Sequence, residues 1–506
     1  MTTARTLRLL CLLLAATFAS AAFAGDATPP NPYAAIQSDI EQRIADGELT
    51  GVSVALVKDG HIVWEHGFGW SDQQAGKRAS EHTAFSIAST TKPFTTTALM
   101  LLVADGKLDL DHPANDYLGA DKLVDARGPS REATLRRLAS HSAGLPTLFA
   151  MYPEGGTARQ PSMAELVRDY GHLVAPVGER YEYSNLGMGV LADIVARQSG
   201  QEYGRFLHDR VLQPLGMRDS FFDTDTTRRS EMAVRYADDG TPLPFYLTAT
   251  PGSGELYASA HDLARFAMLH LGGKGLEDAA KILDQARLDE LHRPTTQIAP
   301  NFHYALGWEV YNAPGQRAIL HHRGGQSGVI TEFVLLPSAG VAAIVLSNRR
   351  GPPGFIADVR DRMLKSVVAD WTTVPSPPTP ALQTLQPVQG YQGSWHGTLL
   401  AQGKPVPVRL MIAADGSGTL AVGDGPANAI TDLGLVDGLL SGDSHGDIGS
   451  VDSRRDQLDQ LALALKLRGE RIDGEIVAWR KTSTSMVMWP HWTVLVRDPE
   501  PARTRP

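Results

Sequence analysis

A serine and a lysine stand three residues apart in the stretch FSIASTTKPFTTTALMLL, residues 85–102. Pro93 lacks an N–H and so favours the first turn of a helix, which the following apolar run extends to a stop at Gly106. On such a helix start Lys92 lies on the same face as Ser89. A serine hydroxyl needs a base to become a good nucleophile, and a lysine whose charge is disfavoured by burial can act as one. The pair suits nucleophilic catalysis; the alternative is an ordinary N-cap serine with an unrelated lysine.

Two later stretches strengthen the catalytic interpretation. The residues YSN at 183–185 directly precede a predicted helix, and HRG at 322–324 directly precede a predicted strand. The patterns S-x-x-K, Y-x-N and H-x-G in this order resemble the serine β-lactamase and penicillin-binding-protein superfamily, in particular its class C-like branch of D-peptidases, β-lactamases and esterases. The resemblance covers roughly residues 32–370 and includes the phrases TLRRLASHSAGLP, LQPLGMRDS, ELYASAHDLARF and YALGW.

The resemblance implies roles for individual side chains. Ser89 would be the nucleophile that forms an acyl-enzyme, and Lys92 would take or relay its proton. Tyr183 would act as a phenolate base, because nearby positive charge lowers the pKa of a tyrosine. Asn185 would hold Lys92 or a substrate amide through its carboxamide.

The resemblance also implies an oxyanion hole made by the backbone N–H groups of Ser89 and Gly325, with Gly324 in contact with the substrate. Members that act on β-lactams or peptidoglycan commonly have Lys-Thr-Gly at the third motif, whereas a histidine there is usual among esterases and D-aminopeptidase-like members. Efficient β-lactam hydrolysis is therefore not expected. Because side chains alternate along a strand, we expect His322 in the cleft and Arg323 on the opposite face, under a helix. The alternative is that Arg323 binds a substrate carboxylate.

The rest of the chain predicts the elements that must position these residues. GVSVALVKDGHIVWEHGFG reads as two strands joined by Asp59-Gly60, which is a hairpin signal. Helical patterns and loops fill residues 94–283, after which YALGWEVY, GVITEFVLLP and GVAAIVLSN are strands and GFIADVRDRMLKSVVADW is a helix. An antiparallel sheet assembled from both ends of one domain, with a helical insertion, accounts for this order. The resemblance likewise implies a sheet with flanking helices beside an all-helical half, with the active site between them.

A domain boundary is predicted after residue 371. The run TTVPSPPTPALQTLQP, residues 372–387, is rich in proline and has no charged residue, which indicates an extended linker over residues 372–388. This linker separates a first domain at 32–371 from a second at 389–506. The second domain shows short strands with glycine turns and no helical pattern, which predicts a small antiparallel barrel or sandwich. It resembles the lipocalin-like extension of some family members. The expected fold class is α+β followed by an all-β barrel, and we expect the barrel to fold separately and to shape access to the cleft without supplying chemistry.

The first 24 residues have the pattern of a signal peptide. Two arginines precede the apolar run LLCLLLAATFASAAFA, whose last residues match a signal-peptidase site with Gly25 as the new N-terminus. A membrane anchor is the alternative, but the run is short for a bilayer span. The pattern predicts a periplasmic or secreted protein. The single cysteine, Cys11, lies inside this segment, so the mature chain would contain no thiol or cysteine metal site.

Composition narrows the choice of partners. The chain has 506 residues, of which 42% are hydrophobic, and a formal net charge of −9 without a basic run. It is therefore a globular protein with more than one core, and nucleic acid is not an expected partner. No histidine or acidic residues show a metal-ligand spacing, and no cofactor is expected. The expected partner is a peptide or small-molecule substrate; the oligomeric state is left open.

The predicted function is an exported serine hydrolase. It would act on amide bonds of peptides that contain D-residues, as an aminopeptidase or a carboxypeptidase, or on small esters. The alternatives are an acyl-transferring cyclase or transpeptidase, a weak β-lactamase, and a catalytically silent binding protein of the same fold. The intact set of Ser89, Lys92 and Tyr183 argues against the silent protein.

Overall fold

The computed structural model describes residues 31–156, 158–384, 390–482 and 485–499. The predicted signal peptide at 1–24 lies outside these residues, as does the end of the predicted linker. Among the described residues, no helix is long and apolar enough to cross a membrane.

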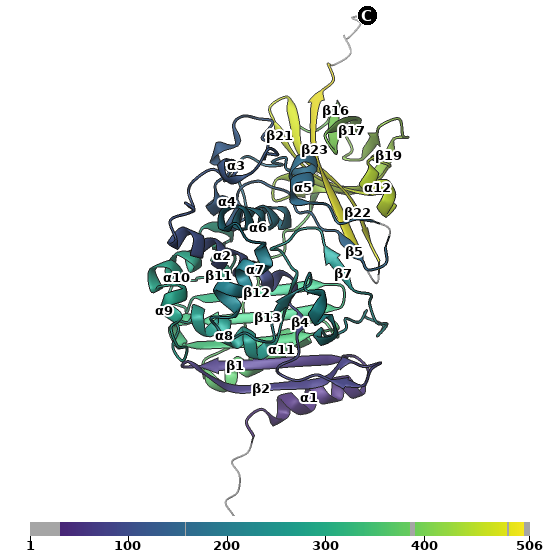
Figure 1. Cartoon of the computed structure of the whole chain (residues 1–506). Coiled ribbons are helices and arrows are strands. Elements are labelled where there is room, and N and C mark those ends of the chain that lie inside the picture. Colours follow the sequence, from purple (N-terminus) through teal and green to yellow (C-terminus); the bar gives the residue numbers. More distant parts are fainter. Residues whose placement is uncertain (1–30, 157, 385–389, 483–484, 500–506) are drawn as a thin grey trace, which may run out of the picture.

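A nine-stranded antiparallel sheet is assembled from both ends of the first domain (Figure 1). Its strands, in spatial order, are β3 (Lys77–Arg78), β2 (His61–Asp72), β1 (Gly51–Lys58), β14 (Val341–Ser347), β13 (Val329–Leu336), β12 (Ile319–Gln326), β11 (Glu309–Tyr311), β10 (Phe302–Tyr304) and β9 (Thr296–Ala299). Strand β1 pairs with β14, so the two ends of the domain meet in the middle of the sheet. The predicted origin of the sheet is confirmed. The single strand expected over YALGWEVY is instead two short strands, β10 and β11, joined by a turn.

The two faces of this sheet are covered by different helices. Helices α1 (Ala34–Ala45) and α11 (Phe355–Val367) enclose one hydrophobic core on the outer face. Helix α8 (Ala260–His270) packs on β1 and β14 from the other side, where a larger core continues into the helical half. The remaining helices of that region are α2 (Lys92–Ala104), α3 (Ala114–Tyr117), α4 (Leu135–Ala139), α5 (Met163–Tyr170), α6 (Asn185–Ser199), α7 (Tyr203–Leu207), α9 (Ala279–Ile282) and α10 (Gln285–His292).

Short strands connect the sheet to the helical half. One small sheet contains β4 (Phe85–Ser86), β8 (Leu256–Ala258) and β6 (Phe221–Phe222), and a second pairs β5 (Met151–Pro153) with β7 (Tyr246–Thr248). Helix α2 runs through the centre of the molecule with an almost entirely buried surface. A helix that is buried all round must hold its polar groups internally, and the hydroxyls of Thr96 and Thr97 indeed donate to backbone carbonyls one turn back.

The second domain is a closed eight-stranded antiparallel barrel. Its strands follow one another around the barrel as β16 (Gly393–Ala401), β17 (Lys404–Ile412), β18 (Gly418–Val422), β19 (Asn428–Val436), β20 (Leu439–His445), β21 (Gln460–Arg468), β22 (Arg471–Lys481) and β23 (Met486–Arg497). The ring closes between β23 and β16, and the short β15 (Gln383–Thr384) adds to β19. The predicted fold class is confirmed. The expectation that no helix interrupts these strands was wrong, because α12 (Val451–Asp456) lies between β20 and β21.

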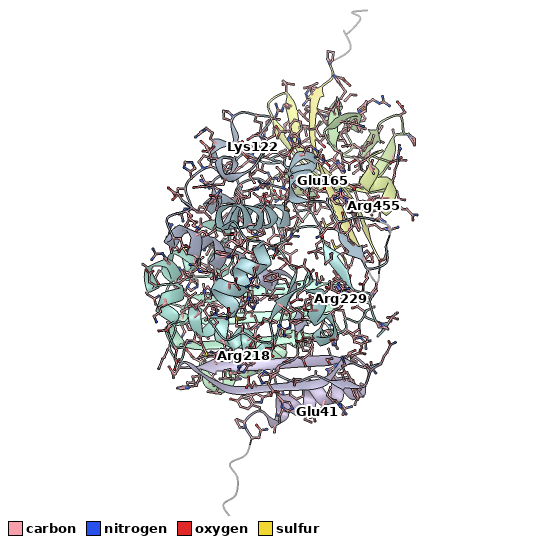
Figure 2. All side chains as sticks on the ribbon, in the orientation of Figure 1. Glu41, Lys122, Glu165, Arg218, Arg229 and Arg455 are labelled. Atoms are coloured by element: carbon pink, nitrogen blue, oxygen red, sulfur yellow. The ribbon has the colours of Figure 1, made fainter. Side chains whose placement is uncertain are left out.

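The barrel and the helical half share one hydrophobic core. The ring of Tyr170 in α5 stacks on Trp489 of β23 with centroids 4.9 Å apart. Figure 2 labels Arg455 at this boundary, where its guanidinium lies 5.4 Å from the ring of Tyr152 and 5.6 Å from that of Trp489. The barrel and the helical half therefore bury apolar surface against each other.

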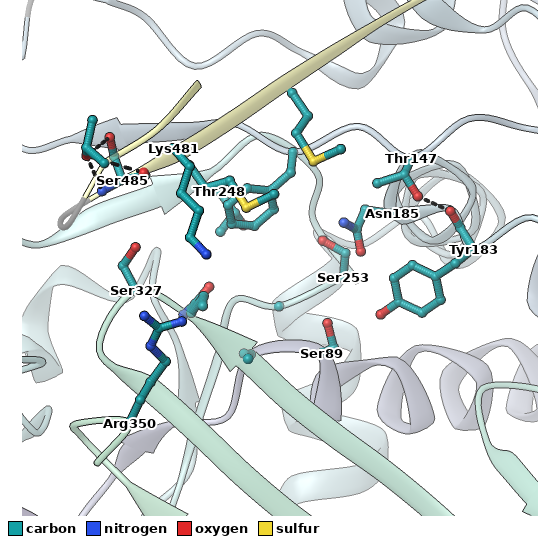
Figure 3. A pocket seen from close by; sticks show the side chains of 18 residues that line it. Ser89, Thr147, Tyr183, Asn185, Thr248, Ser253, Ser327, Arg350, Lys481 and Ser485 are labelled. Carbon is teal, nitrogen blue, oxygen red and sulfur yellow. Dashed lines mark hydrogen bonds between the residues drawn. The ribbon is translucent and has the colours of Figure 1, made fainter. Parts of the chain in front are cut away.

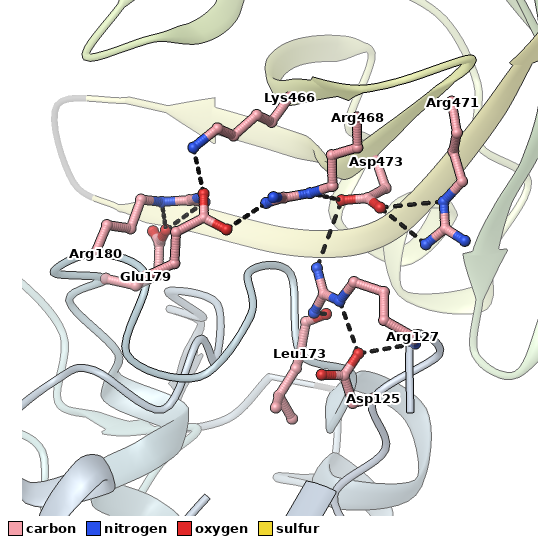
Figure 4. Close-up of polar contacts among 10 residues, drawn as sticks. Asp125, Arg127, Leu173, Glu179, Arg180, Lys466, Arg468, Arg471 and Asp473 are labelled. Carbon is pink, nitrogen blue, oxygen red and sulfur yellow. Dashed lines mark hydrogen bonds and ion pairs between the residues drawn. The ribbon is translucent and has the colours of Figure 1, made fainter. Parts of the chain in front are cut away.

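Charged side chains add to the same contact (Figure 4). Glu179, in the loop before α6, binds Lys466 and Arg468 of β21. Arg127 reaches the buried Asp473 of β22 at 3.5 Å. The pairs of Glu179 join the barrel to the loop that carries Tyr183, and the pair of Arg127 joins it to another loop of the helical half.

Candidate active site

Ser89 lies in a 3-10 turn (Ala88–Thr91) that leads directly into α2. Pro93 occupies the first turn of α2, as its missing N–H predicts. The turn is not capped by a side chain, so Ser89 is not an ordinary N-cap residue. Ala88 has a φ of 45°, in the left-handed region that costs a residue with a Cβ ~1 kcal/mol or more. The strained backbone at Ala88 presents Ser89 at the wall of a cavity.

Lys92 is placed to activate Ser89. Its Nζ lies 3.1 Å from the Oγ of Ser89 and donates a hydrogen bond to the carbonyl of Ser253 at 2.9 Å. The side chain is completely buried, and burial lowers its pKa to about 7, partly opposed by the charge of Glu255. A substantial fraction of Lys92 is therefore the neutral amine at neutral pH, the form that can accept a proton.

Glu255 is a member of the site that the sequence analysis did not single out. It is buried, and its carboxylate accepts hydrogen bonds from the backbone N–H groups of Gly252 and Gly254. Burial raises its pKa, and these backbone hydrogen bonds, together with the charge of Lys92, oppose that shift. The residue stands at the start of β8 with no catalytic spacing to mark it, so only the folded structure brings it to Lys92.

Tyr183 is held by the loop before α6. The backbone N–H of Ser184 donates to Nδ1 of His141 at 3.1 Å, and the ring of His141 lies 4.5 Å from that of Tyr183. The Nζ of Lys92 lies 4.8 Å from the centroid of the Tyr183 ring. Burial raises the pKa of Tyr183 above its usual value, and hydrogen bonding with Ser89 only partly opposes this. The expectation of a lowered pKa and a phenolate base is therefore corrected: Tyr183 is a neutral phenol.

His322 is placed behind the cavity wall rather than in the cleft. It is buried on β12, with Nε2 2.9 Å from the hydroxyl of Tyr304 and Nδ1 2.9 Å from the carbonyl of Arg323. Burial lowers its pKa well below the usual value, helped by the charge of Lys92. The histidine is therefore neutral, and its place differs from the predicted cleft position because Tyr304 lies against it.

The two glycines of the third motif differ in their surroundings. Gly325 lines the cavity, and a Cβ there would meet no atom within 4 Å. A Cβ on Gly324 would lie 2.1 Å from the carbonyl oxygen of Ile87 and 2.4 Å from Oγ1 of Thr331. Gly324 is buried, donates its N–H to Thr331 at 2.8 Å and does not line the cavity as expected, so it lets β12 approach the turn of Ser89.

Arg323 lies on the other face of β12. It is exposed and lines a separate cavity with His321 and with residues of α11, Asp358 and Asp361 among them. This matches the alternation expected along the strand, with Arg323 directed toward the helix on the far side. Arg323 is not among the described residues that line the cavity of Ser89.

A cavity of about 300 Å³ lies beside Ser89, between the two domains (Figure 3). Tyr183 and Asn185 line it on one side, and Asn185 is the first residue of α6. The barrel supplies part of the wall through the ends of β22 and β23, including Met486 and Met488. The backbone of Met488 forms two hydrogen bonds with that of Phe149, at 2.7 and 3.2 Å, which fixes this wall in place. Among the described residues no group of histidine, cysteine and acidic side chains could hold a metal ion.

Comparison with known proteins gives a family whose members include hydrolases, in agreement with the paired Ser89 and Lys92. A family model described as Beta-lactamase matches residues 36–367. The chain is 28% identical over 375 residues to the putative beta-lactamase-like 1 of Homo sapiens, covering 70% of this chain and 72% of that protein. It is 27% identical over 405 residues to the unguisins hydrolase ungD' of Aspergillus campestris (strain IBT 28561), covering 71% of this chain and 74% of the other.

A solved structure extends the likeness to the barrel. The crystal structure of SurE with D-Leu superposes with a TM-score of 0.62 at 20% identity, and the alignment covers 92% of this chain and 99% of that one. At this identity the likeness concerns the fold alone. The match of the family model over most of the first domain, together with the pairing of Ser89 and Lys92, leads to one conclusion: the chain belongs to the beta-lactamase family and is a serine hydrolase.

Proposed function

We propose that this enzyme forms an acyl-enzyme on Ser89 and acts on amide bonds of peptides that contain D-residues, or on small esters. The observation that carries the proposal is the buried Lys92, whose Nζ lies 3.1 Å from the Ser89 hydroxyl and whose pKa is lowered to about 7. A neutral amine at hydrogen-bond distance is the base that a serine nucleophile requires.

The chemistry divides into two steps. Ser89 Oγ attacks the acyl carbon while its proton passes to Lys92 Nζ, and the backbone N–H groups of Ser89 and Gly325 receive the carbonyl oxygen. Tyr183, as a neutral phenol, donates a proton to the leaving amine or alcohol and regains one from Lys92. Asn185 orients the substrate amide. Water, activated by the same groups, then releases the acyl chain from Ser89.

Two of the similar proteins support different parts of this proposal. The relative ungD' is called an unguisins hydrolase, which supports hydrolysis, and the structure of SurE was determined with D-Leu, which supports a D-residue. The cavity supports a small substrate, because its volume of about 300 Å³ is at the lower end of the range for ligand pockets.

We also propose that the protein is exported, with Gly25 as its first mature residue. N-terminal sequencing of protein from the culture or periplasm tests this.

Labelling at Ser89 tests the proposed mechanism. We expect a fluorophosphonate probe to modify wild-type protein at the tryptic peptide that contains Ser89, and Ser89→Ala to lose both labelling and turnover of D-aminoacyl amides and nitrophenyl esters. The melting temperature should change little, because the Ser89 side chain caps no helix. Clear turnover by purified Ser89→Ala would disprove the acyl-enzyme. Product analysis with an added amine separates hydrolysis from acyl transfer.

A further inference from the structure

Two basic side chains enter the cavity on the side away from Tyr183. Figure 3 shows Lys481 and Arg350 reaching into it, Lys481 from the end of β22 in the barrel and Arg350 from the loop after β14. No acidic residue is among the described residues that line this cavity. The whole chain has a net charge of −9, so a cavity wall with two cations and no carboxylate stands out from the average surface.

The positive charge of this pair is only partly balanced. Arg350 binds Asp238 through Nε at 3.0 Å and through Nη2. Its Nη1 has no hydrogen bond to any described residue. The side chain of Lys481 is exposed and forms no ion pair or hydrogen bond with any described residue, although its backbone pairs with that of Met486 in the barrel. The carboxylate of Asp238 therefore balances only one of the two positive charges of Arg350 and Lys481. The other positive charge, with N–H donors that have no partner among the described residues, is available to a group in the cavity.

The third motif does not supply a competing cation. Arg323 lies on the opposite face of β12, in the cavity under α11, and His322 is buried and neutral beside Tyr304. Lys92 does not line the cavity, and its Nζ is hydrogen-bonded to the Oγ of Ser89. A negatively charged group on a ligand in the cavity would therefore meet Lys481 and Arg350 rather than the residues of the third motif.

We propose that Lys481 and Arg350 bind a carboxylate of the substrate, and that the barrel thereby takes part in substrate selection. This inference rests on the proposed function, because it places the carboxylate on a substrate whose scissile carbonyl lies at Ser89. An ammonium and a guanidinium with free donors are suited to a carboxylate, and such charge-assisted hydrogen bonds are about twice as strong as neutral ones. The carboxylate belongs either to the leaving group, as the C-terminus of a peptide, or to the acyl chain.

Two matched pairs of substrates distinguish these sources. N-acetyl-D-Ala-D-Leu and its C-terminal amide place or remove the charge on the leaving group. The mono-4-nitrophenyl ester of glutaric acid and 4-nitrophenyl pentanoate place or remove it on the acyl chain. For each pair the measured quantity is the ratio of kcat/KM for the acid to kcat/KM for the neutral partner.

We expect the acid to be preferred in one of the two pairs, and we expect Lys481→Met and Arg350→Gln each to lower that ratio by about tenfold or more. Lys404→Met is the matched control, because this exposed lysine at the start of β17 lies outside the cavity. Its ratio should equal that of the wild type. Ratios that do not change in either pair for Lys481→Met and Arg350→Gln would overturn the proposal.

A binding measurement separates this inference from the proposed chemistry. In Ser89→Ala protein, calorimetry with the two peptides and with the propyl amides of glutaric and pentanoic acid needs no turnover. Tighter binding of an acid, lost by at least tenfold on adding Lys481→Met, supports the carboxylate site even if wild-type protein fails to label at Ser89. Equal binding of acids and neutral partners overturns it even if Ser89 is the nucleophile.

Discussion

At the scale of single residues, the burial of Lys92 links the site to pH. Its side chain is completely buried and the pKa is lowered to about 7, because the ammonium loses its hydration and Glu255 restores only part of the stabilisation. Tyr183 and His322, by contrast, are neutral near pH 7, because burial raises the pKa of the phenol and lowers that of the imidazole. In the proposed mechanism, Lys92 is therefore the group whose titration sets the rate.

The pH profile of the enzyme should follow this amine. We expect kcat/KM for a neutral ester to rise with pH, to reach half of its plateau at about pH 7, and to fall tenfold per unit below it, because only the neutral amine accepts the proton. Lys92→Arg keeps the positive charge but cannot lose its proton, so it should lower kcat/KM by ~1000-fold or more at every pH. A flat profile between pH 5 and 9 in the wild type would contradict the role of Lys92.

The phenol of Tyr183 provides the second prediction at this scale. Tyr183→Phe keeps the ring that lies beside Lys92 and removes only the proton-carrying hydroxyl. We expect the rate of acylation, measured by stopped-flow release of nitrophenol, to fall by ~100-fold or more. Thr147→Val, which removes a hydrogen bond to the backbone carbonyl of Tyr183 and leaves the phenol unchanged, is the control. An acylation rate for Tyr183→Phe equal to that of the control would show that the phenol only packs.

At the scale of elements, the approach of β12 to the turn before α2 builds the site. Gly324 makes this approach possible, since the carbonyl of Ile87 occupies the space where a side chain would begin. The next residue, Gly325, faces open space. The two neighbouring glycines therefore play different parts, one in packing and one at the cavity wall.

Paired alanine substitutions test that difference. We expect Gly324→Ala to destabilise the protein by about 1–3 kcal/mol, because a Cβ would overlap the Ile87 carbonyl and Thr331. Gly325→Ala should change the free energy of unfolding by less than ~0.5 kcal/mol, since it meets no atom. Urea unfolding followed by tryptophan fluorescence measures both. Similar values for the two variants would contradict the packing role of Gly324.

At the scale of the whole molecule, the barrel is joined to the loop that carries Tyr183. Glu475 of β22 is buried, with one carboxylate oxygen that has no hydrogen-bond partner among the described residues. Burial raises its pKa, and the negative charge of Glu182 raises it further, while Arg180 acts in the opposite direction. Arg180 itself binds Glu182, which directly precedes Tyr183. The contact between the barrel and the loop of Tyr183 therefore contains a buried carboxyl, Glu475, whose protonated form is favoured.

Stability should therefore depend on pH through Glu475. A carboxyl whose pKa is raised on folding contributes most stability below its unfolded pKa of ~4.5, and this contribution is lost as pH rises toward the folded pKa. Glu475→Gln cannot ionise, so we expect it to raise the melting temperature relative to wild type at pH 8.5 and not at pH 5. Glu470→Gln, on the exposed end of the same barrel, is the control and should show no such difference. An equal effect of Glu475→Gln at both pH values would contradict the buried acid.

The sequence by itself indicated the family, through the resemblance carried by its three motifs, and the fold class, through local patterns. It also predicted that Ser89 and Lys92 share one face at a helix start, and in the structure the Nζ of Lys92 lies 3.1 Å from the Oγ of Ser89. A helix start with Pro93, alternation along strands and glycine turns act over a few residues, so they can be read directly from the chain. The direction of Arg323 followed in the same way from the period of a strand.

The ionisation of the site and the makeup of its walls were decided only by the tertiary structure. Glu255 beside Lys92, Tyr304 against His322 and Lys481 opposite Ser89 come from segments far apart in the chain. Burial depends on every element packed around a group, so the raised pKa of Tyr183 could not follow from the type of its neighbours. The shared core likewise depends on the fit of α5 to β23, two surfaces that are each complete only after folding.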